Sequence, residues 1–164
     1  MIRAGTGSDA GTLHQILMEP SVRRWWRDPD PPAQIEQQLH SSGPEILLVI
    51  EVEGQVAGGI QYYEELEPDY RHAAIDIFLG HQWQGRGLGT QAVWLLARYL
   101  FQQRGHHRLT IDPSTDNARA IASYRKVGFR PVGVMRRYER QADGSWHDGL
   151  LMDLLVDELP SSLG

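Results

Sequence analysis

The sequence contains no cysteine, which excludes disulfide bonds, thiolate metal ligands and a cysteine nucleophile. It also lacks any stretch close to the roughly 20 apolar residues that a helix needs to cross a bilayer. The first residues, Met1 to Gly5, do not form the long apolar run of a secretion signal. We therefore expect a cytoplasmic protein without a membrane partner.

Positive charge is also scarce. The chain has 16 Lys and Arg against 21 Asp and Glu, which gives a formal net charge of −5. A nucleic-acid-binding surface needs clustered Lys and Arg, so we expect no nucleic-acid partner, and a cationic small molecule suits the charge better. The histidines do not combine with acidic residues at metal-ligand spacing, so no metal is expected.

Length and hydrophobic content indicate a single domain over residues 1–164. A chain of 164 residues with 41% hydrophobic residues supplies one substantial core. The sequence has no internal repeat and no low-complexity tract. It leaves two oligomeric states open, a monomer and a homodimer.

Hydrophobic periodicity and turn residues predict a mixed α/β (α+β) chain in which most strands follow one another directly. In the first half we expect a strand at 1–5, a helix that begins at Ser8 or Asp9 and ends before Pro20, a proline-rich loop at 25–32, and a helix at 33–40. A hairpin of strands 45–51 and 55–63, an acidic loop at 64–69 and a strand at 73–80 follow. The second half is expected to contain a long helix from Leu88 to about Gly105, a strand at 107–111, a short helix capped by Asp116 and ended by Gly128, and two strands at 129–140 and 146–156.

A glycine-rich turn lies between the strand at 73–80 and the long helix. Its residues are Gln84, Gly85, Arg86, Gly87, Leu88, Gly89 and Thr90. The bare glycine backbone brings N–H groups up to an anion at the helix N-terminus, and a pyrophosphate is the natural ligand. Arg86 adds a charge-assisted contact and Thr90 a hydroxyl. The alternative is a turn that only reverses the chain.

Two other phosphate-binding motifs are less suitable. A Walker loop needs Gly-Lys followed by Ser or Thr, which this turn lacks. The dinucleotide fingerprint is closer, because Asp112 lies about where a ribose-binding acid would stand. Its third glycine is expected at position 90, however, and that residue is threonine. A dinucleotide-binding oxidoreductase therefore remains an alternative.

Asn117 and Tyr124 are seven residues apart on a predicted helix, so both side chains fall on one face about two turns apart and both could line one cleft. Tyr124 as a neutral phenol suits a general acid. The alternative is an aromatic ring that packs against the sheet.

Three carboxylates stand in or at the end of predicted strands, namely Asp76, Asp112 and Asp148. A carboxylate in an apolar strand is costly unless it is paired or functional. Each could be a satisfied buried acid. The functional interpretation requires that the fold bring the three together.

Two linked motifs resemble the GNAT (Gcn5-related) acetyltransferase superfamily: Gln84-x-x-Gly87-x-Gly89, and the segment from Asp116 to Phe129 with its asparagine and tyrosine. The resemblance implies a central, mostly antiparallel, splayed sheet of about six to seven strands flanked by about four helices. It also implies that acetyl-CoA is the cosubstrate, bound by the turn from Gln84 to Thr90 and by Asn117. The backbone at Phe78 or Leu79 would polarise the thioester carbonyl, and Tyr124 would face the sulfur.

Several segments further resemble the aminoglycoside 6'-N-acetyltransferases, which are antibiotic-resistance enzymes of this superfamily. They are Glu19-Pro20 with Trp25-Trp26, Ile75-Asp76, the glycine turn, and the stretch from Thr110 to Tyr124. The resemblance implies that Asp76, Asp112 and Asp148 bind ammonium groups of the acceptor, and that Asp76 is a candidate base. Trp25 and Trp26 would form a wall over the acceptor, or only staple the next helix.

The sequence therefore predicts an acetyl-CoA-dependent N-acetyltransferase whose acceptor is most simply the 6'-amino group of an aminoglycoside. Its catalytic residues would be Asp76 as base, Asp112 as acceptor ligand and Tyr124 as acid. Three alternatives stay open. The first is a GNAT enzyme that acts on a protein N-terminus, a lysine, another polyamine or a siderophore intermediate. The second is a non-catalytic acyl-CoA-binding module, and the third is the oxidoreductase.

Overall fold

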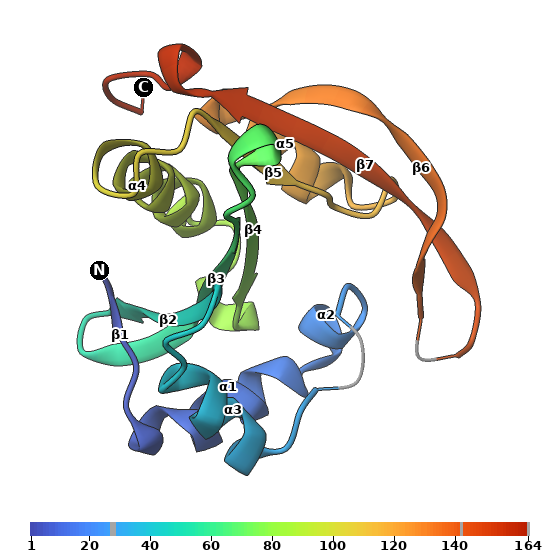
Figure 1. Ribbon diagram of the computed structural model, residues 1–164. Helices are drawn as coiled ribbons and strands as arrows, with labels where there is room; N and C mark the ends of the chain where they lie inside the picture. Colours follow the sequence, from blue (N-terminus) through green and yellow to red (C-terminus); the bar gives the residue numbers. More distant parts are fainter. Residues whose placement is uncertain (27–28, 142, 164) are drawn as a thin grey trace.

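The computed structural model describes residues 1–26, 29–141 and 143–163, and these residues form one seven-stranded sheet with helices packed against it (Figure 1). The strand order is β1-β2-β3-β4-β5-β7-β6. The strands are β1 (Ile2–Ala4), β2 (Glu45–Val52), β3 (Gln55–Glu65), β4 (His72–Leu79), β5 (Arg108–Ile111), β6 (Arg130–Arg140) and β7 (Trp146–Leu155). The described helices are α1 (Ala10–Leu17), α2 (Pro20–Arg23), α3 (Pro32–Leu39), α4 (Leu88–Gln102) and α5 (Ala118–Val127).

This architecture confirms the expected mixed α/β fold and its sheet of about seven strands. The short helix α2 was not expected. It begins at Pro20, which ended the preceding helix in the sequence-based prediction, because proline is well suited to the first turn of a new helix. Two residues of the proline-rich loop, 27 and 28, lie outside the described part of the chain.

The sheet is antiparallel except between β4 and β5. In the described residues these two parallel strands pair at only two positions, Ala73 with Leu109 and Ala74 with Thr110. Beyond Ala74, β4 keeps its pairing with β3 up to Leu79 but has no paired residue on the β5 side. The two strands therefore diverge, and a gap opens between their C-terminal ends.

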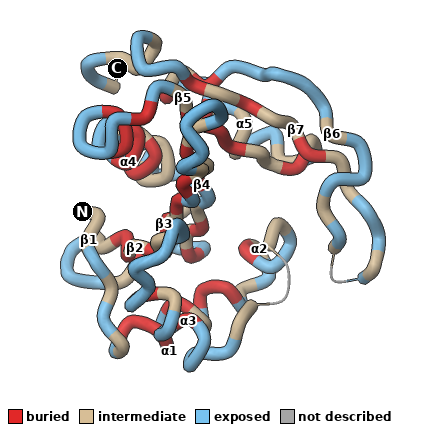
Figure 2. Tube along the Cα trace, viewed as in Figure 1, coloured by how far each residue is buried: buried red, intermediate tan, exposed pale blue. Residues whose placement is uncertain are grey.

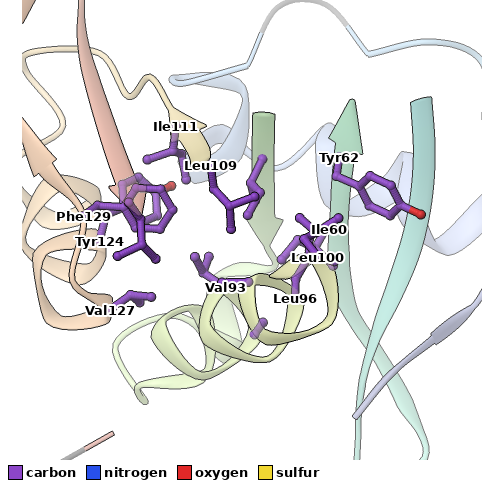
Figure 3. Close-up of a cluster of buried hydrophobic side chains, with 14 of the residues drawn as sticks. Ile60, Tyr62, Val93, Leu96, Leu100, Leu109, Ile111, Tyr124, Val127 and Phe129 are labelled. Atoms are coloured by element: carbon purple, nitrogen blue, oxygen red, sulfur yellow. The ribbon is translucent and has the colours of Figure 1, made fainter. Parts of the chain in front are cut away.

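Helices lie against both faces of the sheet (Figure 1), and buried residues are found both in the strands and in the helices (Figure 2). On one face, α4 packs against Ile60 and Ile75 in a large cluster that also includes Tyr124 and Phe129 (Figure 3). On the other face, α1 and α3 pack against a second cluster that includes Phe78. Cross-strand partners point to the same face, so Gln61 and Asp76, which are paired, share the α1/α3 face.

Two consecutive glycines of β3 allow a close approach to Phe78 of β4. A Cβ atom on Gly58 would lie 2.1 Å from the Phe78 carbonyl oxygen, and one on Gly59 would lie 2.6 Å from the Phe78 ring. Larger residues would push β4 away at this point. The pair thus fixes the end of β4 that borders the gap.

Two local expectations were wrong. Glu64 and Glu65 belong to β3 and not to a loop, and Glu64 is buried, where it pairs with Arg104 at 2.8 Å and with His106 at 2.7 Å. The cap of α5 is Asn117 rather than Asp116, because the Asn117 side-chain oxygen accepts the Ala120 N–H at 3.1 Å. For Glu64 and Glu65, the acidic composition of the segment alone had suggested a solvated loop.

Candidate active site

A cleft of about 940 Å³ opens where β4 and β5 diverge. Its walls come from the segment after α2, the ends of β4 and β5, the glycine-rich turn, α5 and β6. Most residues singled out in the sequence line it: Trp25, Trp26, Asp76, Phe78, Leu79, Gln84, Gly85, Gly87, Gly89, Thr90, Asp112, Asn117 and Tyr124. Among the described residues, Arg86, Leu88 and Asp148 are not part of the lining.

The glycine-rich turn leads into the N-terminus of α4. Gly85 has φ +77° and Gly87 has φ +79°, a left-handed conformation that glycine adopts without steric cost, and Gly87 is the N-cap residue of α4. The unpaired N–H groups of the first helical turn therefore face the cleft beside Gly85 and Gly87. This is the geometry in which a helix N-terminus binds a phosphate group.

Gln84 and Thr90 hold the turn in place. The Gln84 side-chain amide donates to the Leu79 carbonyl at 2.8 Å, and its oxygen accepts from the Arg119 guanidinium at 3.4 Å. The Thr90 hydroxyl bonds to the Ser123 hydroxyl at 2.7 Å, which joins α4 to α5. Gln84 and Thr90 thus bind neighbouring elements, in addition to lining the cleft.

Arg86 and Leu88 point away from this wall. The Arg86 guanidinium lies 5.1 Å from the centre of the Trp83 ring, and Leu88 packs against the large core cluster. Any contact of these two residues with a phosphate in this conformation would come from their backbone. Arg119 is the guanidinium that lies against the turn, since its Nη2 atom is 3.6 Å from where a Cβ on Gly85 would stand.

Tyr124 is buried against Phe129 and reaches the cleft from α5 (Figure 3). Burial raises the pKa of its phenol well above the usual range, and the charges of Asp76 and Asp112 raise it further. The side chain is therefore a neutral hydroxyl at physiological pH and can donate a proton.

Asp76 and Asp112 lie at the same end of the cleft. The Asp76 carboxylate opens onto the cleft, but protein surrounds it, and this burial together with the nearby Asp112 charge raises its pKa to about 6. Gln61 donates to it at 3.4 Å. Burial also raises the pKa of Asp112, and a hydrogen bond of 2.6 Å from the Tyr138 hydroxyl opposes this effect.

The end of β4 presents backbone groups to the gap. Gly80 donates its N–H to Ala57 of β3 at 2.9 Å. Successive residues of a strand alternate in direction, so the Phe78 N–H also points to β3 and the Leu79 N–H points into the gap. Of the two residues expected to polarise a carbonyl group, Leu79 has the better placed N–H.

The two tryptophans close the cleft opposite α5. Trp26 packs edge-on against Phe78 with ring centroids 5.0 Å apart, and the Arg24 guanidinium lies 4.8 Å from the Trp25 ring. Both side chains line the cleft. Trp26 thus packs against the sheet as well as lining the cleft, and a contact of either tryptophan with an acceptor stays a prediction.

Asp148 is engaged elsewhere. Its carboxylate accepts the Arg137 N–H at 2.7 Å, at a position of β6 where the pairing with β7 is irregular. The structure thus brings Asp76 and Asp112 together and holds Asp148 on the adjacent hairpin. A contact between Asp148 and an acceptor stays a prediction.

The cleft is also lined by residues that the sequence did not point to. Those with polar or charged side chains that matter most for the chemistry are Gln61, Arg119, Ser123, Lys126, Tyr138, Glu139 and Arg140. Arg119 was within reach of prediction, because it stands two residues after Asn117 in the first turn of α5. Nothing in the sequence indicated that Tyr138 lines the cleft, because the direction of its side chain depends on an irregularity in the pairing of β6.

The described residues contain no group of three or more His, Asp or Glu side chains that could hold a metal ion. Among the same residues, no helix is long and apolar enough to span a membrane.

Comparison with known proteins identifies the family. The family model described as "Acetyltransferase (GNAT) family" matches residues 11–129. Spermidine N(1)-acetyltransferase of Escherichia coli K12 is 28% identical over 150 residues, which cover 88% of this chain and 79% of that protein. Aminoglycoside N(6')-acetyltransferase type 1 of Klebsiella pneumoniae is 28% identical over 153 residues, which cover 82% of this chain and 75% of that protein.

A solved structure shows the same fold. The aminoglycoside acetyltransferase AAC(6')-Ib, in complex with coenzyme A and kanamycin, superposes with a TM-score of 0.77 at 24% identity, covering 96% of this chain and 95% of that one. The family model covers more than half of the chain, and the fold agrees with it. The chain belongs to the GNAT family of acetyltransferases.

Proposed function

We propose that this N-acetyltransferase transfers the acetyl group of acetyl-CoA to a primary amine of a cationic small molecule, most simply the 6'-amino group of an aminoglycoside. The observation that carries the proposal is the placement of two carboxylates, Asp76 and Asp112, beside the neutral phenol of Tyr124 at one end of the cleft. Carboxylates bind and deprotonate an ammonium group, and a phenol protonates a leaving thiolate.

The residues of the cleft suit acetyl-CoA. The N–H groups after Gly87, with the Arg119 guanidinium, would hold the pyrophosphate. The gap between β4 and β5 offers the Leu79 N–H to a carbonyl oxygen. When bound, acetyl-CoA supplies an activated acyl group. Asn117, whose side-chain oxygen caps α5, would contact the pantetheine arm through its remaining amide donors.

The remaining roles belong to side chains of this chain. An amine acceptor is protonated near neutral pH and must lose a proton before it can attack. With a pKa of about 6, Asp76 is ionised at pH 7 and can take this proton directly or through water. Asp112 binds the acceptor, and Tyr124 gives its proton to the departing sulfur. No covalent enzyme intermediate is needed.

The acceptor class follows from the charge of the cleft. Three carboxylates, those of Asp76, Asp112 and Glu139, line the cleft, and the charges of Glu139 and, from outside the lining, Glu45 also raise the pKa of Asp76. Such a site favours an acceptor with several ammonium groups. Aminoglycosides and polyamines both fit this description, and the relatives include one enzyme named for each.

The test follows thiol release from acetyl-CoA with kanamycin, tobramycin, gentamicin, spermidine or a lysine peptide as acceptor. We expect rapid release with 6'-amino aminoglycosides and its loss in Asp112→Asn. Release with spermidine alone would assign the polyamine, and release with the peptide alone would assign a protein acceptor. A chain that binds acetyl-CoA but shows no acceptor-stimulated release would be a non-catalytic module, and one that binds NADH but not coenzyme A would be a dinucleotide-binding protein.

A further inference from the structure

The hairpin of β6 and β7 contains a bulge that directs one side chain toward the cleft. Met135 pairs with Gly149 and Glu139 pairs with His147, so three residues of β6 stand opposite Asp148 alone. The middle one, Arg137, has φ +51°, an uncommon value for a residue other than glycine. Such a bulge bends the strand and changes the direction of the side chains next to it.

Two groups of β7 support the bulge. The Asp148 carboxylate accepts the Arg137 N–H at 2.7 Å, which satisfies the backbone donor that the irregular pairing would leave free. The ring of Tyr138 lies directly over Gly149, where an added Cβ atom would approach the ring to 2.8 Å. Only glycine leaves this space for the ring.

The bulge delivers the Tyr138 hydroxyl to Asp112. Its hydrogen bond to the Asp112 carboxylate is 2.6 Å long, although 49% of the tyrosine residue remains exposed to solvent. Exposed tyrosines are free to adopt other rotamers, so this contact depends on the supports at Asp148 and Gly149. Tyr138 also lines the cleft, next to where an acceptor would lie.

We infer that Tyr138 is a positioning and specificity-determining residue for the acceptor. The bulge, held by Asp148 and with Gly149 leaving space for the ring, keeps the Tyr138 hydroxyl hydrogen-bonded to Asp112. Asp112 therefore stays oriented to bind an ammonium group while Asp76 takes the proton. The inference rests on the proposed function. It also gives Asp148 a role through the backbone of Arg137, in place of direct contact with the acceptor.

The charges around Asp112 support separate roles for Asp112, which binds the acceptor, and Asp76, which takes the proton. The titratable groups that interact with Asp112 are Asp76 from β4, Tyr124 from α5 and Tyr138 from β6, and Glu139 of β6 acts in turn on Asp76 and Tyr138. Among them, Tyr138 is the group whose hydrogen bond lowers the pKa of Asp112. Two carboxylates in one site take different roles when their surroundings separate their pKa values.

The first experiment compares Tyr138→Phe with the wild type, using the best acceptor from the thiol-release assay. Loss of a hydrogen bond to a charged group should raise the KM for the acceptor roughly tenfold. The KM for acetyl-CoA should not change. Because the pKa of Asp112 would rise, the acid limb of kcat/KM for the acceptor should move to higher pH. Tyr70→Phe, which changes a tyrosine that is 74% exposed and distant in the fold, serves as the matched control.

The second experiment separates the two roles of Asp148. Asp148→Asn keeps an oxygen that accepts the Arg137 N–H, whereas Asp148→Ala does not. If Asp148 acts through the bulge, Asn should retain the wild-type KM and Ala should reproduce the defect of Tyr138→Phe. If Asp148 binds the ammonium group itself, Asn and Ala should raise the KM equally. Asp157→Asn, an exposed site, is the control.

The outcomes distinguish this inference from the proposed function. If no acceptor stimulates thiol release by the wild type, the proposed function fails. If the wild type is active and Tyr138→Phe changes only the melting temperature, with an unaltered acceptor KM and pH profile, Tyr138 is a structural tie and the inference is overturned.

Discussion

The Gln84 side chain donates a hydrogen bond of 2.8 Å to the Leu79 carbonyl, and this bond ties the glycine-rich turn to the last residue of β4. Gln84→Glu removes the donor and sets a carboxylate against the carbonyl oxygen. Because the turn and the Leu79 N–H would both shift, we expect a lower affinity for acetyl-CoA and a kcat reduced by roughly tenfold. Steady-state kinetics measures both. Gln91→Glu, an exposed glutamine on α4, should behave as the wild type.

A pair of glycines tests the role of the turn. Gly87 has φ +79° and Gly105 has φ +69°, and nothing lies within 4 Å of an added Cβ atom at either position. Alanine at either site should therefore lose about 1–2 kcal/mol of stability from backbone strain alone. Only Gly87→Ala should also weaken binding of coenzyme A, measured by calorimetry. Equal affinities of the two variants would argue against phosphate binding at the N-terminus of α4.

Tyr124→Phe should slow transfer while the donor still binds. The Phe side chain keeps the ring that packs against Phe129, whose centroid is 6.4 Å away, and removes only the hydroxyl. General acids contribute about 10²–10⁴-fold to rates, so kcat should fall within this range. The dissociation constant of coenzyme A should change by less than about twofold. A variant with wild-type kcat would show that the sulfur is protonated by another group or by water.

Asp76→Asn should abolish activity and raise stability. The pKa of Asp76 is raised to about 6, so the ionised form is less stable in the folded chain than in the unfolded one. This destabilisation is absent below the unfolded pKa near 3.9 and complete above about pH 6. Asp76 is also exposed to solvent through the cleft, which screens this effect, so we expect only a small gain: at pH 7.5 the variant should melt about 2 °C higher than the wild type, and at pH 4 the difference should shrink.

The same residue sets the pH dependence of the wild type. A base with a pKa of about 6 is protonated below that pH, so kcat/KM for the acceptor should fall on the acid side of pH 6. Asp69→Asn, an exposed acid in the loop after β3, should leave both the pH profile and the melting temperature unchanged. A profile that stays flat down to pH 5 would assign the proton transfer to a different group.

Glu64→Gln tests a buried ion pair that is not part of the cleft. Glu64 is 4% exposed and binds both Arg104 and His106, and the Arg104 hydrogen bond lowers its pKa. Because Arg104 is 44% exposed, its charge would stay solvated in the variant, so the cost is that of weakened hydrogen bonds to a buried group, about 1–3 kcal/mol, or a melting temperature at least about 2 °C lower. The kcat at 25 °C should stay within about twofold of the wild type.

The pH dependence of this contribution has a definite sign. The lowered pKa of Glu64 means that its stabilisation is present above the unfolded pKa near 4.3 and is lost as the pH falls through the folded value. Glu65→Gln is the matched control, because the next residue of the strand points to the opposite face. If the two variants melt alike at pH 7.5, the buried pair contributes nothing beyond a surface charge.

Local patterns in the sequence predicted the parts of the site that depend on short stretches of chain. The glycine turn before α4 and the asparagine and tyrosine of α5 are of this kind, and they line one cleft. The two main strand hairpins were also predicted from alternation and turn residues. These features need only backbone conformation and periodicity, which neighbouring residues determine.

The remaining features depend on contacts between distant segments. Glu64 looked like part of a solvated acidic loop because its partners Arg104 and His106 lie about 40 residues away along the chain. The hydrogen bond between Asp148 and the Arg137 N–H could not be foreseen, because it exists only once β6 has formed its bulge. Strand registers and bulges of this kind are set by packing across the sheet, which residue types alone do not reveal.

The short pairing between β4 and β5 bears on how the protein behaves when it binds a ligand. Within the described part of the chain, only Ala73 and Ala74 pair across this junction, so the amide hydrogens of Ile77 and Leu79 have no strand partner on that side. A ligand in the gap would protect them from exchange with solvent deuterium, whereas the Gly80 amide, already bonded to Ala57, would exchange at an unchanged rate. Deuterium uptake at three neighbouring amides would therefore report the occupancy of the gap, even with an acyl donor that cannot react.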